Sequence, residues 1–109
     1  MCGITGFVAR PGTQGIPELL RSMCDLIAQR GPDDEGFGHY GAVHMGMRRL
    51  AIIDPEGGKQ PVATPDANYA LTFNGEIYNY RELRAELISK GCTFVTDSDS
   101  EVLLWGLVP

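Results

Sequence analysis

Cys2 combines two chemical groups once Met1 is removed from the chain. It then carries a thiol and a free α-amine, and an ordinary α-amine titrates close to neutral pH. The amine can serve as base for its own thiol, as it does for N-terminal threonine nucleophiles. On position alone, the preferred interpretation is a small residue that opens a strand, because a cysteine at the second position has many causes.

Asn74, Gly75 and Glu76 follow an apolar run and form a second candidate group. The Asn74 side-chain amide and the Gly75 N–H could both point at a developing oxyanion, and glycine allows a close approach. Glu76 would offer a negative charge to an ammonium group. The alternative is an ordinary hairpin turn, for which Asn-Gly is the strongest signal.

Arg48 and Arg49 precede an apolar run, and Asp99 lies in a Ser-Asp-Ser-Glu segment. An arginine that leads into a buried strand can clamp a carboxylate through two hydrogen bonds. Adjacent residues of a strand point to opposite faces, so at most one of the two arginines faces a given pocket. Taken alone, Asp99 is interpreted as an acid at a helix start that complements the helix dipole.

The composition is that of an ordinary globular domain with a net charge of -5 and no cluster of Lys and Arg. This disfavours nucleic acid and anionic membranes as partners. The three cysteines are widely spaced, which argues against a disulfide framework or a zinc site and fits a reducing cytoplasm. His39 and His44 have no metal-ligand spacing and are interpreted as strand or turn residues.

The elements that must position these residues follow from apolar periodicity, capping residues and turns. The expected strands cover residues 3–9, two or three stretches within 37–53 (the clearest at 50–53), 69–73 and 93–96. The expected helices run from Pro17 to a stop at Gly31, over 80–90 behind Asn79, and from a capping box at 98–101. Residues 10–15 and 30–36 are expected to be loops. Many short neighbouring strands favour antiparallel pairing.

Six segments together resemble the start of a class II glutamine amidotransferase, an enzyme with an N-terminal nucleophile. They are residues 1–7, 30–33, 49–54, 60–61, 74–79 and 98–102. Within that class, the segment 74–79 (Asn-Gly-Glu-Ile-Tyr-Asn) is most similar to glutamine-hydrolysing asparagine synthetases. Two positions depart from the family pattern, Gln29 and Met47, where histidine is frequent.

The resemblance implies a role for each candidate. Cys2 would attack the side-chain amide of glutamine, while Asn74 and Gly75 hold the oxyanion. Arg49 would bind the α-carboxylate of the substrate, and Glu76 and Asp99 its α-ammonium group. The backbone near Ile52 and Ile53 would line the pocket.

The resemblance also implies an α+β fold, an αββα sandwich of two antiparallel sheets that is incomplete in these 109 residues. Residues 1–109 would form the N-terminal part of the glutaminase domain. L-Glutamine and an ammonia-accepting synthetase domain or subunit are the implied partners. No cofactor is expected for the glutaminase half, because ATP and Mg²⁺ belong to the synthetase domain.

Two alternatives remain open from the sequence. The chain could be a truncated, non-catalytic module for binding or assembly. It could also be the amidotransferase half of another class II enzyme, such as glucosamine-phosphate synthase.

Overall fold

The computed structural model describes residues 2–50 and 59–109. Three strands form the first sheet in the order β1-β3-β2, namely β1 (Gly3–Val8), β3 (Val43–Arg49) and β2 (Asp34–Tyr40). Both pairings are antiparallel. A second, two-stranded antiparallel sheet joins β4 (Val62–Ala63) to β5 (Ala70–Leu71). The predicted α+β fold with two antiparallel sheets is therefore confirmed.

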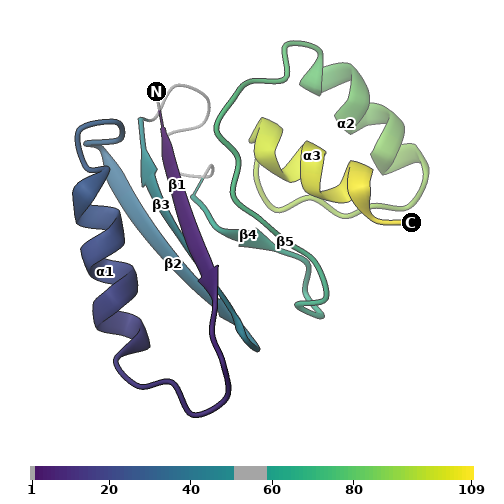
Figure 1. Cartoon of the computed structure of the whole chain (residues 1–109). Helices are drawn as coiled ribbons and strands as arrows, with labels where there is room; N and C mark the ends of the chain where they lie inside the picture. Colours follow the sequence, from purple (N-terminus) through teal and green to yellow (C-terminus); the bar gives the residue numbers. More distant parts are fainter. Residues whose placement is uncertain (1, 51–58) are drawn as a thin grey trace.

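Helices lie on both sides of the first sheet (Figure 1). The helix α1 (Ile16–Leu26) packs on β1 and β3, whereas α2 (Tyr80–Ser89) packs against α3 (Asp99–Leu107). The helix α3 also contacts β4 and β5. The layers follow the order helix, sheet, sheet, helix, as expected for an incomplete αββα sandwich.

The core beneath α1 is built around Gly46. Leu20 and Cys24 on α1 are fully buried. A Cβ atom at Gly46 would collide with the Cys24 sulfur and crowd Thr5 and Leu20, so the absence of a side chain allows this close packing. Cys24 is thus a small core residue, as the helical periodicity predicted.

The two sheets meet where Gly36 of β2 faces the backbone carbonyl of Gln60. A side chain at position 36 would occupy the space of that carbonyl oxygen. The Gln60 side chain in turn accepts the Phe73 N–H through Oε1, at 2.5 Å. Residue 60 therefore ties the first sheet to the chain that leads out of β5.

Several predicted boundaries were wrong. Helix α1 ends at Leu26 and not near Gly31, because residues 27–30 form turns with hydrogen bonds such as Arg30 N–H to Ile27 O. Strand β2 begins at Asp34, inside the predicted 30–36 loop, since it pairs with Arg49 of β3. The expected strand at 50–53 falls largely outside the described residues, and Leu50 belongs to no strand.

The predicted strand at 93–96 is absent from the structure, because Val95 and Thr96 donate their N–H groups to the Glu101 carboxylate and not to a neighbouring strand. The predicted capping box at 98–101 is half right. Ser98 does cap α3, and its Oγ accepts the Ser100 N–H at 3.1 Å. Asn79 precedes α2 as predicted, without a side-chain capping hydrogen bond.

Candidate active site

Cys2 lies immediately before β1, with its side chain half-buried. Its sulfur accepts the Leu50 N–H at 3.3 Å and donates to the Leu50 carbonyl at 3.6 Å. The Cys2 carbonyl accepts a hydrogen bond from Arg30 Nε at 3.2 Å. Both the backbone and the side chain of this residue are therefore held in place.

Arg49, at the end of β3, lies beside Cys2. The register pairs Gly3 with Arg48, so the next step of the same antiparallel pair brings Cys2 and Arg49 together. Side chains alternate along strands, which places Cys2 and Arg49 on one face of the sheet and Arg48 on the other. The Arg49 residue is only 5% exposed.

The two adjacent arginines belong to opposite faces of the sheet, as the alternation of side chains along a strand predicts. Arg48 points to the α1 side, where its Nη1 lies 2.8 Å from Glu35. Glu35 also forms an ion pair with Arg21 of α1, with 2.7 Å between Arg21 Nη1 and Glu35 Oε1. The hydrogen bond from Arg21 is the largest cause of a lowered pKa at Glu35, and Arg48 adds to it. Arg48 is thus part of a structural ion network, which leaves Arg49 as the arginine on the other face.

Asn74, Gly75 and Glu76 lie in the connection between β5 and α2. Asn74 is half-buried, whereas Gly75 and Glu76 are exposed. A Cβ atom at Gly75 would lie 3.0 Å from the Phe73 ring, so glycine suits this turn of the chain. No returning strand follows: α2 begins at Tyr80, which disfavours the hairpin alternative.

Asp99, the first residue of α3, is buried, with 7% of its surface exposed. Its Oδ2 accepts the Ile77 N–H at 2.9 Å. This hydrogen bond attaches the start of α3 to the connection that carries Asn74, Gly75 and Glu76.

The predicted site residues therefore fall into two groups. Cys2 and Arg49 lie together at one end of the β1–β3 pair. Asp99 is joined through Ile77 to the 74–76 segment. Within the described parts of the chain, no hydrogen bond links Cys2 to Asn74 or Gly75. The predictions for Ile52 and Ile53 lie outside the described residues.

Three residues with clear structural roles near these groups were not predicted from the sequence. Leu50 meets the Cys2 sulfur through its backbone, which no residue-type pattern reveals. Arg30 donates a hydrogen bond to the Cys2 carbonyl. The only sequence feature that could have indicated this role is its place in the Arg-Gly-Pro-Asp segment. Glu101 was interpreted only as a helix-capping residue. In the structure it is 3% exposed, and its carboxylate accepts the Thr96 N–H in the segment before α3.

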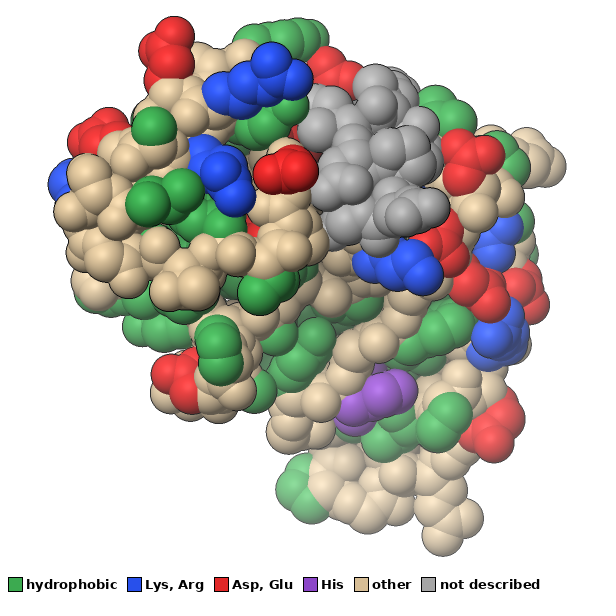
Figure 2. Space-filling view, turned by 180° about the vertical axis from the view of Figure 1, so that it is seen from behind, with side chains coloured by type: hydrophobic (Ala, Val, Ile, Leu, Met, Phe, Trp, Pro, Cys, Tyr) green, Lys and Arg blue, Asp and Glu red, His purple; other side chains and the backbone are tan. Residues whose placement is uncertain are grey.

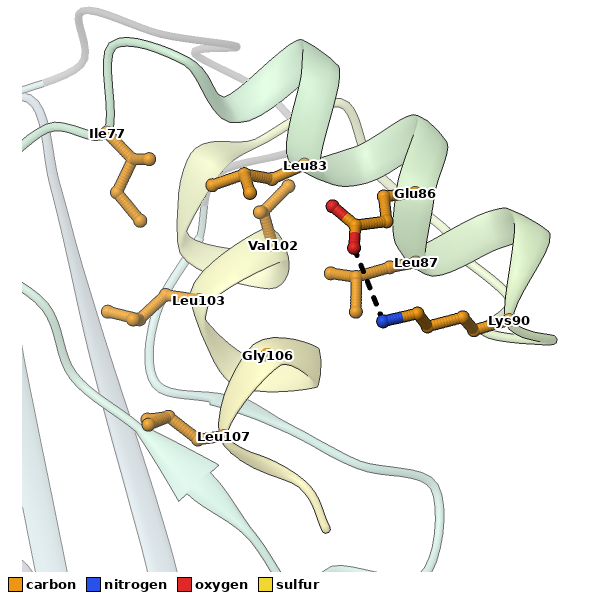
Figure 3. Close-up of a pocket in the computed structure, with 9 residues that line it drawn as sticks. All are labelled: Ile77, Leu83, Glu86, Leu87, Lys90, Val102, Leu103, Gly106 and Leu107. Atoms are coloured by element: carbon orange, nitrogen blue, oxygen red, sulfur yellow. Dashed lines mark ion pairs between the residues drawn. The ribbon is translucent and has the colours of Figure 1, made fainter.

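A separate apolar groove of about 260 Å³ lies between α2 and α3 (Figure 3). It is lined by Ile77, Leu83, Glu86, Leu87, Lys90, Val102, Leu103, Gly106 and Leu107. Its two charged residues, Glu86 and Lys90, pair with each other at 3.3 Å. None of the predicted glutamine-binding residues lines it, so this groove is not the candidate active site.

The charge distribution agrees with the sequence. On the face shown in Figure 2, Lys and Arg side chains are interspersed with Asp and Glu, without a continuous basic area. His39 and His44 pair across β2 and β3, with their Nδ1 atoms 2.8 Å apart. The described residues contain no group of three or more His, Cys, Asp or Glu side chains that could hold a metal ion. Nor does that part of the chain contain a helix long and apolar enough to cross a membrane.

The helix, sheet, sheet, helix layers agree with the αββα sandwich expected of a class II glutamine amidotransferase domain. The family profile of the glutamine amidotransferase domain matches residues 1–108, and the chain belongs to that family. It is 52% identical over 107 residues to "Asparagine synthetase [glutamine-hydrolyzing] 1" of Bacillus subtilis, covering 95% of this chain and 17% of that protein.

Other relatives bear similar names. A "Putative asparagine synthetase [glutamine-hydrolyzing]" of Mycobacterium bovis is 42% identical over 122 residues, covering 97% of this chain and 19% of the relative. The asparagine synthetase of Sandersonia aurantiaca is 40% identical over 104 residues, covering 94% and 19%. The chain thus spans less than a fifth of the length of these relatives.

Proposed function

We propose that this chain is the N-terminal part of a glutaminase domain, in which Cys2 hydrolyses L-glutamine to glutamate and ammonia. The contact between the Cys2 sulfur and the Leu50 N–H, next to buried Arg49, is the observation that carries the proposal. A nucleophile and a carboxylate-binding cation at one strand end suit an amino-acid substrate.

The reaction begins when removal of Met1 frees the α-amine of Cys2. The amine takes the thiol proton, directly or through a water, and the sulfur attacks the carbon of the glutamine side-chain amide. The amide oxygen becomes an oxyanion, which Asn74 and the Gly75 N–H stabilise with hydrogen bonds. The C–N bond then breaks, the leaving nitrogen takes the proton from the α-ammonium group, and ammonia departs.

The remaining glutamyl thioester reacts with water. The α-amine accepts a proton from the attacking water, the C–S bond breaks, and glutamate leaves as the thiol is restored. Arg49 binds the substrate α-carboxylate, while Glu76 and Asp99 bind its α-ammonium group. The backbone near Ile52 and Ile53 completes the pocket in this proposal.

The ammonia would serve asparagine synthesis from aspartate in a synthetase domain or subunit. That reaction needs ATP and Mg²⁺, which the synthetase part would bind. The glutaminase reaction needs only groups of this chain, including the Cys2 α-amine and the Gly75 N–H, and water. The same proposal includes a cytoplasmic location. Its partners are L-glutamine and the synthetase part, and neither nucleic acid nor a membrane is among them.

The test is an intact-mass measurement on the purified chain. The reagent is a glutamine analogue whose side-chain amide is replaced by a chloromethyl ketone. We expect loss of Met1 and a single adduct at Cys2, suppressed by excess glutamine. The variants Cys24→Ser and Cys92→Ser should keep the adduct, and Cys2→Ser should lose it. An adduct at Cys24 or Cys92, or one that glutamine does not suppress, would contradict the proposal.

The second candidate is a non-catalytic module for binding or assembly. Exposed apolar residues favour it, because Val8 of β1 is 73% exposed and Leu107 of α3 is 62% exposed. Such a module would form no adduct, whether Met1 is retained or removed, and it would change its oligomeric state or bind a partner through these surfaces.

A further inference from the structure

Glu101 is a buried carboxylate in the first turn of α3, and the mechanism above does not use it. One oxygen, Oε1, accepts the Thr96 N–H at 2.8 Å and the Thr96 hydroxyl at 2.6 Å. The other, Oε2, accepts the Val95 N–H at 3.0 Å. A carboxylate removed from water is tolerated because these donors replace its hydration.

These bonds differ from those of a capping box. In a capping box, Glu101 would accept the N–H of Ser98. In the structure, the Ser98 N–H instead donates to Thr96 Oγ1 at 3.2 Å, and Glu101 reaches past Ser98 to residues 95 and 96. Glu101 therefore fixes the segment that enters α3, and with it the direction in which the first turn of the helix begins.

Asp99 lies in that same first turn of α3 and is hydrogen-bonded to Ile77. The Ile77 N–H donates to Asp99 at 2.9 Å. The Ile77 side chain points into the groove between α2 and α3, beside Leu83 and Val102 (Figure 3). Ile77 is therefore held on both its backbone and its side chain, only two residues from Gly75.

We propose that Glu101 is a positioning residue for the glutamine site. It fixes the start of α3, so that Asp99 holds Ile77 and thereby the 74–76 segment in place. This inference rests on the proposed function, in which that segment supplies the oxyanion-binding groups. Glu101 itself touches neither the substrate nor the reacting atoms.

The variant Glu101→Gln keeps the size of the side chain and replaces one acceptor oxygen with an NH₂ group, which faces the donors at residues 95 and 96. The matched control is Glu82→Gln, which makes the same chemical change at an exposed position on α2. Both are compared in the purified 109-residue chain.

The first readout is hydrogen exchange of individual amides, followed by NMR. In Glu101→Gln we expect the Ile77 amide to exchange about tenfold faster or more, since its acceptor Asp99 loses its fixed position. Amides of the β1–β3 pair should keep their exchange rates. The Glu82→Gln control should leave the Ile77 amide unchanged.

The second readout compares two labelling rates at Cys2, with the chloromethyl ketone analogue of glutamine and with iodoacetamide. In Glu101→Gln we expect the analogue rate to fall about tenfold or more, while the iodoacetamide rate stays the same. Cys24, which is fully buried, reports on the fold, because it should remain unlabelled in an intact chain.

Each outcome decides the question. An unchanged Ile77 amide overturns the inference, and so does a faster Ile77 amide with an unchanged analogue rate. If Cys24 becomes labelled in Glu101→Gln, Thr96→Val replaces it. That variant removes the hydroxyl bond to Glu101 together with the acceptor of the Ser98 N–H, keeps the Glu101 carboxylate, and should shift both readouts in the same direction. If the unsubstituted chain does not react with the analogue, the proposed function is wrong, and the Ile77 exchange rate alone still decides whether Glu101 fixes this segment.

Discussion

The sulfur of Cys2 meets both backbone groups of Leu50, the N–H at 3.3 Å and the carbonyl oxygen at 3.6 Å. The residues are 48 positions apart in the chain and are brought together by the antiparallel pairing of β1 with β3. This contact holds the proposed nucleophile at the strand end, and in the proposed mechanism its own α-amine is the base.

An inserted lysine between Met1 and Cys2 therefore tests the base. Lysine at the second position is too large for efficient removal of Met1, so Cys2 stays internal and its amine becomes an amide. We expect the rate of labelling by the chloromethyl ketone analogue to fall about a hundredfold or more, the usual contribution of a positioned base. Labelling by iodoacetamide should change little.

The control for this insertion is a longer leader that a specific protease removes directly before Cys2. Cleavage should restore the analogue rate. An inserted chain that reacts as fast as the unmodified one would show that another group acts as the base.

Arg49→Lys tests the carboxylate-binding role. Lysine keeps the charge but cannot form the two parallel hydrogen bonds of a guanidinium group. We expect the glutamine concentration that halves the rate of analogue labelling to rise about tenfold or more, which corresponds to a loss of about 1.4 kcal/mol or more. The iodoacetamide rate at Cys2 should be unaffected.

Arg10→Lys, at an exposed position, is the matched control for this substitution and should leave glutamine protection unchanged. Because Arg49 is buried, the melting temperature of each variant is measured alongside. Undiminished protection by glutamine in a folded Arg49→Lys chain would remove Arg49 from the binding site.

Much of the secondary structure was readable from local signals. Helix α2 and the start of α3 were predicted from capping residues, and Ser98 does cap its helix. The assignment of Arg48 and Arg49 to opposite faces followed from strand geometry. In the structure, Arg48 forms an ion pair with Glu35. These features depend on residues close together in the chain, where periodicity and capping chemistry act directly.

Features that depend on particular side-chain contacts or on strand pairing were missed. The predicted strand at 93–96 fails because a carboxylate five residues away takes the N–H of Thr96. His39 and His44 lack the sequence spacing of metal ligands, and nothing else in the sequence pairs them. The register of β2 with β3 nevertheless places them opposite each other. Single-sequence patterns do not encode which strand pairs with which, so the position of Leu50 beside Cys2 could not be derived from them.

The close packing at Gly46 predicts opposite effects for two glycine substitutions. Gly46→Ala would place a methyl group against the Cys24 sulfur and should lower the free energy of unfolding by about 1–3 kcal/mol. Gly106→Ala adds the same group inside α3, where nothing lies within 4 Å, and should raise it by about 0.5–1 kcal/mol. Urea titrations of both variants provide the measurement.

Cys24→Ala, combined with Gly46→Ala, removes the sulfur that causes the worst collision. The double variant should regain part of the stability that Gly46→Ala loses, because Thr5 and Leu20 still crowd the new methyl group. A Gly46→Ala chain as stable as the original would contradict the packing described around α1.

The ion network at Glu35 predicts how stability depends on acid. The hydrogen bond from Arg21, helped by Arg48, holds the folded-state pKa of Glu35 below its ordinary value of 4.5. Protonation therefore favours the unfolded chain. The stability that Glu35 contributes is present at neutral pH and is lost as the pH falls from about 4.5 through the lower folded value.

Glu35→Gln should be less stable than the original chain at pH 7, and this difference should shrink towards pH 3. Urea titrations across this range measure it, and Glu82→Gln, an exposed carboxylate, is the control whose effect should vary much less with pH. A difference between Glu35→Gln and the original chain that stays constant down to pH 3 would mean that the Glu35 charge does not stabilise the contact between α1 and β3.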